Sequence, residues 1–321
     1  MPTLQPEIDR EFLEHVREGL AGDPKTLSPK YLYDARGCEL FEAICDLPEY
    51  YPTRTEIGIL EDRRDEISAR VPDDAVLIEL GCGSARKTRI LLEEFGDRLD
   101  AYVPVDIAAE YIEPLRLELA DEFPDLEVRP HIADFTRPLT LGDDDLADRP
   151  VVVFFPGSTI GNFVPADAVR LMRRVETLID SGAPGGGFLV GVDLWKDSAT
   201  LTAAYDDAAG VTADFNLNLL DRMRADCDID VDRDDFRHEA RVNRDKGRVE
   251  MHLVAGSPVE VDVDGTPVAF AAGESIHTEN SYKYSPERFA AMAADAGLAV
   301  DGYWTDRAER FSVQMLVPQT S

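Results

Sequence analysis

Short apolar runs separated by stretches of helical spacing dominate the middle of the chain. The apolar runs are too short for helices, and we expect strands at 76–80, 101–106, 126–130, 151–155 and 187–192. Several carry few polar residues, which is typical of strands buried on both faces of a parallel sheet. Helices are expected between them at 55–70 (with Thr55 as N-cap), 108–120 and 165–180. This alternation predicts an α/β fold with a doubly wound sheet.

The pattern changes on either side of that block. Before it, we expect helices at 7–20 and 38–47 and a loop with two prolines at 47–54. After it, residues 198–228 have helical spacing, and alternating strands are expected at 235–243, 247–255, 258–263 and 266–272. Ser285 and Pro286 predict a last helix, which Gly297 ends, before strands at 299–305 and 311–318. We therefore expect two domains, one formed by 56–192 plus 283–321 and an α+β domain formed by 1–55 plus 193–282.

The first strand of the sheet leads into a glycine-rich turn. Glu79 lies at the strand end, Gly81 and Gly83 follow, and Ser84 is the expected N-cap of the next helix. Glycines let a ligand approach the backbone closely because they have no Cβ. A dinucleotide-binding turn would have a third glycine where Arg86 stands. The turn instead resembles that of the class I S-adenosylmethionine (SAM) methyltransferases; an ordinary turn that closes an α/β unit is the alternative.

Three further candidates follow the next strands. Asp106 ends the second strand, at the spacing expected of an acid that binds ribose hydroxyls, although it could instead cap the following helix. Asp134 and Phe135 follow the third strand and could bind an adenine, or form a plain turn. The fourth strand leads into Gly157 and Asn162, and ligands of such sheets bind beyond the carboxyl ends of the strands.

Composition excludes several classes of protein. The net charge is −31, from 33 basic and 64 acidic residues, which disfavours nucleic acid and anionic membranes as partners. An acidic, lysine-poor surface suits a high-salt cytoplasm, although a GC-rich genome would also explain it.

No run approaches the ~20 apolar residues of a membrane helix. The first residues lack the pattern of a signal peptide. Four scattered cysteines without metal-ligand or disulfide spacing fit a reducing cytoplasm, and the acidic stretch at 142–145 is expected to be a solvated loop.

From about residue 27 onward the chain resembles the L-histidine Nα-methyltransferases of ergothioneine biosynthesis. The segments that carry the resemblance are Tyr33-Asp34, 47–56 (LPEYYPTRTE), Glu79-Leu80-Gly81, 157–162 (GSTIGN) and 276–282 (IHTENSY). The resemblance implies a class I SAM-dependent methyltransferase, Rossmann-like, with a second α+β domain for the substrate. It also implies three successive methylations of the α-amine of histidine, giving hercynine. The two-domain organisation by itself leads us to expect the substrate between the domains, where pockets usually form.

The resemblance assigns roles residue by residue. SAM would be held by Gly81, Lys87, Asp106, Asp134 and Phe135. Histidine and its mono- and dimethyl intermediates would be bound by Tyr33, Phe41, Tyr50, Gly157, Asn162, Tyr205, Met251, Glu279 and Ser281. Within that set, Tyr33 and Asn162 are the catalytic candidates, and Glu279 and Ser281 would hold the imidazole. We expect no metal and a monomer.

The imidazole assignment also makes sense from the residues alone. Glu279 and Ser281 are two apart in an extended segment, so both point to one face and Asn280 points away. A neutral imidazole has one donor and one acceptor nitrogen, which a carboxylate and a hydroxyl satisfy together. Three alternatives remain open: an Nα-methyltransferase of another amino acid such as tryptophan, a SAM-binding protein without turnover, and a transferase that uses another nucleotide.

Overall fold

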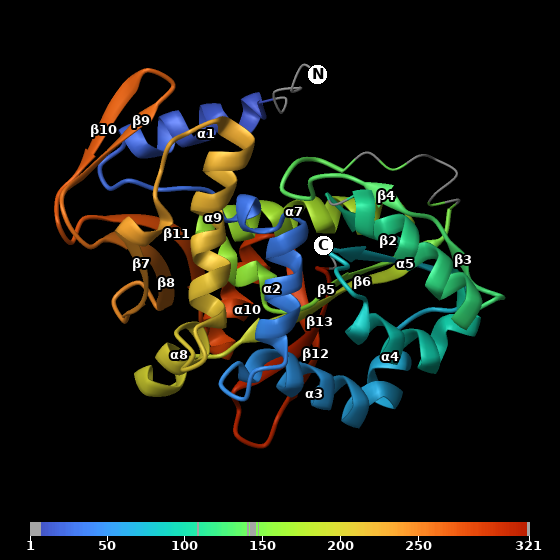
Figure 1. Ribbon diagram of the computed structural model, residues 1–321. Helices are drawn as coiled ribbons and strands as arrows, with labels where there is room; N and C mark the ends of the chain where they lie inside the picture. The colour runs from blue at the N-terminus through green and yellow to red at the C-terminus, as the bar shows by residue number, and fades with distance from the viewer. Residues whose placement is uncertain (1–7, 108, 140, 142–145, 147, 320–321) are drawn as a thin grey trace, which may run out of the picture. The chain divides into compact units, whose positions relative to one another are not determined.

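The computed structural model describes residues 8–107, 109–139, 141, 146 and 148–319 (Figure 1). The contacts divide the chain into two compact units. The first unit is Met1–Tyr51 with Lys196–Ser281, and the second unit is Pro52–Trp195 with Tyr282–Ser321. The acidic stretch at 142–145 lies outside the described residues.

A mostly parallel sheet forms the centre of the second unit. Its strand order is β12-β13-β6-β5-β1-β2-β3, and β4 also pairs with β2. The strands are β1 (Ala75–Leu80), β2 (Leu99–Asp106), β3 (Glu127–Val128), β4 (His131–Ile132), β5 (Pro150–Phe155), β6 (Ala183–Asp193), β12 (Leu298–Thr305) and β13 (Phe311–Pro318). Only β13 runs antiparallel to its neighbours β6 and β12, while β1 pairs in parallel with β2 and β5. This is the class I methyltransferase sheet that the sequence predicted.

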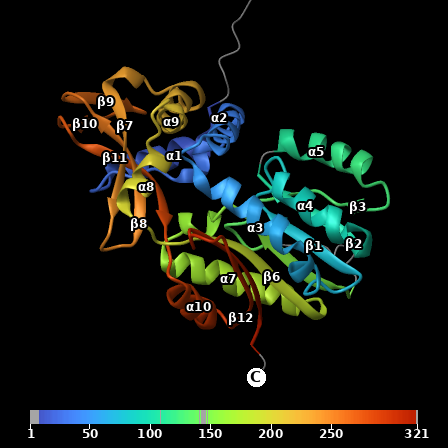
Figure 2. The same ribbon diagram turned by 90° about the horizontal axis from the view of Figure 1, so that it is seen from below.

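Helices cover both faces of this sheet (Figure 2). On one face, α7 (Pro165–Asp180) and α10 (Pro286–Asp295) pack on Val76, Ile78 and Val153. On the other face, α3 (Tyr51–Ser68), α4 (Arg86–Phe95) and α5 (Ala109–Glu122) pack on Leu77, Val152 and Phe154. Successive side chains of a strand point to opposite faces of the sheet. Because helices cover both faces, nearly every position of the central strands is buried, which explains their apolar sequences.

The first unit combines helices with antiparallel strands. Its helices are α1 (Arg10–Ala21), η1 (Pro29–Leu32), α2 (Ala35–Cys45), α8 (Ser198–Tyr205), α9 (Val211–Cys227) and η4 (Arg233–Asp235). A three-stranded sheet has the order β11-β8-β7, and β9 pairs with β10. These strands are β7 (Phe236–Asn243), β8 (Arg248–Ala255), β9 (Val259–Val263), β10 (Thr266–Phe270) and β11 (Ser275–Tyr282). The strands and α9 bury a common core that includes Phe215, Leu219 and Met251.

Three local predictions were wrong. The helix expected at 55–70 begins at Tyr51, because proline is tolerated in a first helical turn and Pro52 occupies it. Ser84 is not an N-cap: the preceding turn continues, and Ala85 takes that place in a left-handed conformation (φ 52°). In place of the third strand expected at 126–130, the chain forms two strands of two residues each, β3 and β4, which both pair with β2 at the edge of the sheet.

Candidate active site

The glycine turn after β1 brings Gly81 and Phe135 together in the second unit. Gly81 is left-handed (φ 75°), and a Cβ there would lie 3.4 Å from Cε1 of the Phe135 ring. Its amide donates to the Val105 carbonyl oxygen at 2.8 Å. Phe135 also meets Phe155 edge-on, with ring centroids 5.5 Å apart. The turn therefore places the bare backbone of Gly81 beside an aromatic ring.

Asp106 ends β2 and faces the same turn. Its Oδ2 lies 3.4 Å from the Gly83 amide nitrogen and 3.8 Å from the Cys82 thiol, both donors. Burial raises the pKa of Cys82, so this group stays a thiol at neutral pH. The carboxylate thus has an anchored orientation at the carboxyl end of the sheet, where a ribose diol can donate to it.

Asp134 is engaged in a local turn. Its Oδ1 accepts from the Thr136 amide at 2.9 Å and from the Thr136 hydroxyl, and its Oδ2 lies 3.5 Å from Nε of Arg137. The segment therefore forms the turn that was the alternative interpretation, and adenine binding by Asp134 and Phe135 stays a prediction.

Lys87 is held by a residue that the sequence analysis assigned no role, Glu56. The Glu56 carboxylate is fully buried, and its Oε2 lies 2.6 Å from Nζ of Lys87. The same carboxylate accepts from the Gly157 amide, at 2.8 Å to Oε2 and 3.1 Å to Oε1. Gly191 makes room for it, because a Cβ at that position would lie 2.1 Å from Oε1. One buried carboxylate therefore fixes both the first turn of α4 and the turn after β5.

The turn after β5 is tightly constrained. Gly157 and Ser158 are both left-handed, with φ of 77° and 57°. The Ser158 hydroxyl accepts from the Asp193 amide at 2.9 Å, and Asn162 closes the short helix η3 (Thr159–Asn162). Gly157 and Asn162, both candidate substrate residues, therefore lie on a segment held from two sides.

Glu79 is a second buried carboxylate without a predicted role. Its Oε2 accepts from the Thr88 hydroxyl at 2.6 Å and from the Tyr102 hydroxyl. Burial raises the pKa of Glu79 to about 7, and burial also raises the pKa of Tyr102, which remains a donor. Glu79 ties β1, β2 and α4 together directly before the glycine turn.

Because of this raised pKa, Glu79 should make the protein less stable as pH rises. Between the unfolded value of 4.5 and about 7 the folded state keeps a proton that the unfolded state has lost. At about 1.4 kcal/mol per pKa unit, the loss reaches roughly 3 kcal/mol above the folded pKa. Glu79→Gln keeps an acceptor for both hydroxyls, so we expect it to match wild type at low pH and to exceed it at pH 8.

Urea unfolding of both proteins across this pH range, at one high salt concentration, measures the effect. A difference in unfolding free energy that does not change with pH would contradict the assignment.

An aromatic cluster in the first unit brings together the three tyrosines assigned to the substrate. The Tyr33 ring lies 5.6 Å from Phe41, the Phe41 ring 6.2 Å from Tyr50, and the Tyr50 ring 6.1 Å from Tyr205. Burial raises the pKa values of Tyr33 and Tyr50 far above the ordinary value, with the Glu279 carboxylate adding to both shifts. Both tyrosines are therefore neutral phenols at physiological pH, and Glu279 is their electrostatic neighbour.

Glu279 and Ser281 lie on β11 next to this cluster. Both side chains are buried, whereas Asn280 between them is more exposed. The Ser281 hydroxyl lies 2.7 Å from the Tyr205 hydroxyl. Met251, also buried, lies on the neighbouring strand β8. The structure thus gathers one carboxylate, one serine hydroxyl and three phenols of the predicted substrate set within one unit.

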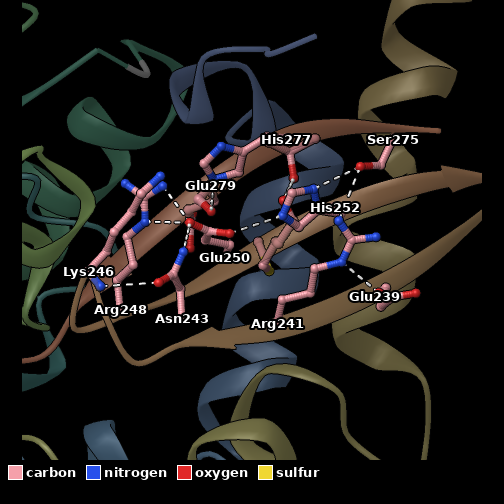
Figure 3. Close-up of polar contacts among 12 residues, drawn as sticks. Glu239, Arg241, Asn243, Lys246, Arg248, Glu250, His252, Ser275, His277 and Glu279 are labelled. Atoms are coloured by element: carbon pink, nitrogen blue, oxygen red, sulfur yellow. Dashed lines mark hydrogen bonds and ion pairs between the residues drawn. The ribbon is translucent and has the colours of Figure 1, made fainter. Parts of the chain in front are cut away.

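A network on β8 and β11 supports the backbone at Glu279 (Figure 3). Nε2 of His277 donates to the Glu279 carbonyl oxygen at 3.0 Å, and the His277 ring stacks on His252 with centroids 4.8 Å apart. Burial lowers the pKa of His277, and burial with the nearby Arg241 charge lowers that of His252 to about 4. Two neutral rings can stack without charge repulsion, so this support is intact at pH 7.

Phe215 is a member of the aromatic cluster that the sequence did not mark. Its ring lies 5.5 Å from Tyr33 and 6.0 Å from Phe41. In the sequence it has the helical spacing of a core residue of α9, which hides any second role.

Among the described residues, no group of His, Cys, Asp and Glu could hold a metal ion. No helix within the described residues is both long enough and apolar enough to span a bilayer.

Comparison with known proteins agrees with these features. Residues 12–318 match the family described as "Histidine-specific methyltransferase, SAM-dependent". A histidine N-alpha-methyltransferase from Mycolicibacterium smegmatis is 43% identical, over 94% of this chain and 93% of the relative, and one from Mycobacterium tuberculosis is 39% identical over 94% and 92%. Ergothioneine biosynthesis protein 1 of Neurospora crassa is 30% identical over 88% of this chain and 32% of its own length. The chain belongs to the family of histidine-specific, SAM-dependent methyltransferases.

Proposed function

We propose that this chain transfers three methyl groups in succession to the α-amine of L-histidine, giving hercynine, as the first step of ergothioneine biosynthesis. The observation that carries the proposal is the group formed by Glu279, Ser281 and the phenols of the first unit. A buried carboxylate beside a hydroxyl matches the two nitrogens of an imidazole. Two relatives that match over most of their length bear the name histidine N-alpha-methyltransferase.

SAM fits the second unit and supplies a methyl group on a positively charged sulfur. In this proposal Asp106 accepts from the ribose hydroxyls, and the adenine packs against the Phe135 ring near the backbone of Gly81. Asp134 lies next to that ring and is the candidate acceptor for the adenine amino group. Lys87, fixed by Glu56, supplies the one cation assigned to this site.

Substrate recognition is proposed to place the α-amine at Tyr33. The amine attacks through its lone pair, so the α-ammonium must first release a proton to solvent, as must each methylated ammonium before the next transfer. The N–H groups that remain are then oriented by acceptors. Tyr33, a neutral phenol, can accept from an N–H through its oxygen while Tyr50, Tyr205 and Asn162 hold the carboxylate and amine. Orientation of this kind supplies much of the acceleration in a displacement that needs little acid–base chemistry.

The aromatic rings explain how one site can serve three successive transfers. Each methylation removes an N–H donor, and the last product is a quaternary ammonium without any. The ring faces of Tyr33, Phe41 and Phe215 attract a cation regardless of its N–H count. The site therefore keeps an attraction for the intermediates as its hydrogen bonds to the amine are lost.

The test follows product mass after incubation with SAM and, separately, histidine, tryptophan, leucine or histamine. We expect mass gains of one, two and three methyl groups on histidine. Histamine lacks the carboxylate that Tyr50, Tyr205 and Asn162 are proposed to hold, so its turnover should be far slower. Methylation of tryptophan in preference to histidine would overturn the choice of substrate. Equal rates for histamine and histidine would overturn the carboxylate assignment alone.

Three statements stay predictions within this proposal. One is the division into a SAM domain at 56–192 plus 283–321 and a histidine domain at 1–55 plus 193–282. The second is a cytoplasmic location, which the reduced state of Cys38, Cys45, Cys82 and Cys227 supports, since none forms a disulfide. The third is a monomeric state, which sedimentation would measure.

A further inference from the structure

A chain of neutral hydrogen bonds links four elements of the first unit and is buried at Asn216 and Thr278. The Thr278 hydroxyl donates to Oδ1 of Asn216 at 2.7 Å, and Nδ2 of Asn216 lies 2.9 Å from Nδ1 of His238. Nε2 of His238 then lies 2.8 Å from the Tyr205 carbonyl oxygen. We name this chain the Asn216 relay. It joins β11, α9, β7 and the end of α8, and its central residue, Asn216, is fully buried.

The direction of every bond in the relay is fixed by one carbonyl. Nδ2 of Asn216 also lies 3.2 Å from the carbonyl oxygen of His252, which can only accept. The amide nitrogen must therefore face His252 and His238, so Nδ1 of His238 is an acceptor. The proton of a neutral imidazole is then on Nε2, where it is donated to the Tyr205 carbonyl. Burial lowers the pKa of His238, in agreement with a neutral ring at pH 7.

Both ends of the relay adjoin groups assigned to the substrate. Thr278 directly precedes Glu279 on β11, and its hydroxyl also lies 3.1 Å from the Met251 carbonyl oxygen. At the other end, the hydroxyl of Tyr205 lies 2.7 Å from that of Ser281. The segments that carry Glu279, Ser281, Met251 and Tyr205 are thus connected through a single amide and a single imidazole.

We propose that Asn216 and His238 are positioning residues for histidine recognition, holding the imidazole-binding strand and Tyr205 in one fixed arrangement. This inference rests on the proposed function. Neither residue needs to touch the substrate. The Asn216 amide and both His238 nitrogens have partners, and such a network is rigid. A shift of about 1 Å in a positioning group can cost about a hundredfold in rate.

Two substitutions break the relay without changing its volume much. Asn216→Asp places an oxygen against the His252 carbonyl and removes the donor to His238. His238→Phe keeps a ring but removes both nitrogens, whereas His238→Gln retains an N–H for the Tyr205 carbonyl. We expect Asn216→Asp and His238→Phe to lower kcat/KM for histidine by roughly tenfold to a hundredfold, mainly through KM, and His238→Gln to recover part of the loss.

The controls separate positioning from general damage. SAM affinity, measured by calorimetry, should stay at the wild-type value in all variants. Leu219→Ala, on the same helix, removes a buried side chain outside the relay and should destabilise the protein without raising KM for histidine. If Asn216→Asp does not fold, Thr278→Val and Thr278→Ser replace it, and only the valine variant should raise KM.

Several results would overturn the inference. One is wild-type kcat/KM for histidine in folded Asn216→Asp or His238→Phe. Others are a parallel loss of SAM affinity, or an equal rise in KM in Leu219→Ala. Failure of the wild-type enzyme to methylate histidine would instead overturn the proposed function, so the two failures are distinguishable in one assay.

Discussion

Glu279→Ala is expected to lower kcat/KM for histidine by about a hundredfold, because a charge-assisted hydrogen bond is worth about 1.5–3 kcal/mol. The wild-type carboxylate is buried, and its charge adds to the rise that burial causes in the pKa values of Tyr33 and Tyr50, the phenols assigned to the site. An apolar substrate such as leucine would leave this carboxylate without a ligand partner, and sites of that kind reject such analogues strongly. The variant should therefore lose histidine turnover and also much of its discrimination against leucine.

The measurement is kcat/KM for histidine and leucine in wild type and variant. Glu274→Ala is a matched control, since it removes a carboxylate that lies just before β11 and pairs with Lys25. We expect Glu274→Ala to keep wild-type kinetics. If Glu279→Ala kept both its histidine turnover and its preference over leucine, the imidazole would be recognised elsewhere, while the family assignment would stand.

The order of elements was predictable because burial on two faces gives an unmistakable pattern. Helix α7 has the bounds expected from its spacing, and the start of α10 follows from Ser285, whose hydroxyl accepts from the Arg288 amide. The prediction that Ser84 is the N-cap of α4 was wrong, because the glycine turn continues through Ala85 in a left-handed conformation. The sequence cannot show how far a turn extends, since that depends on contacts such as the Ala85 amide with the Cys82 carbonyl.

The residues that hold the site together were harder to predict than those that line it. Glu56 and Glu79 stood inside segments that supported the family resemblance. Glu79 lay in a strand expected to be buried, but nothing in the spacing of Glu56 marked it as a buried carboxylate, and the partners of neither were predicted. Glu56 meets Gly157 across 101 positions of sequence, and Asn216 meets Thr278 across 62. Such long-range pairs are set by the tertiary fold, and a single sequence has no periodicity that reports them.

Asp106→Ala is expected to weaken SAM binding by roughly tenfold to a hundredfold, the equivalent of one charge-assisted hydrogen bond of about 1.5–3 kcal/mol. The carboxylate faces Gly83 and Cys82 of the glycine turn, so it stands where a ribose bound at that turn would present its hydroxyls. A carboxylate can accept from both vicinal hydroxyls at once, whereas alanine can accept from neither. Calorimetric titration with SAM measures the loss directly, without turnover.

Asp100→Ala tests whether the effect belongs to the position and not to loss of charge from β2. Asp100 lies near the start of the same strand and pairs with Arg129 at 3.4 Å and Arg149 at 3.3 Å. Its removal should change stability slightly and leave SAM affinity at the wild-type value, because ligands of such sheets bind at the carboxyl ends of the strands. Equal losses in both variants would mean that net charge governs binding. An unchanged dissociation constant for SAM in Asp106→Ala would contradict the assignment. Asp106 would then only stabilise the glycine turn, and another residue would bind the ribose.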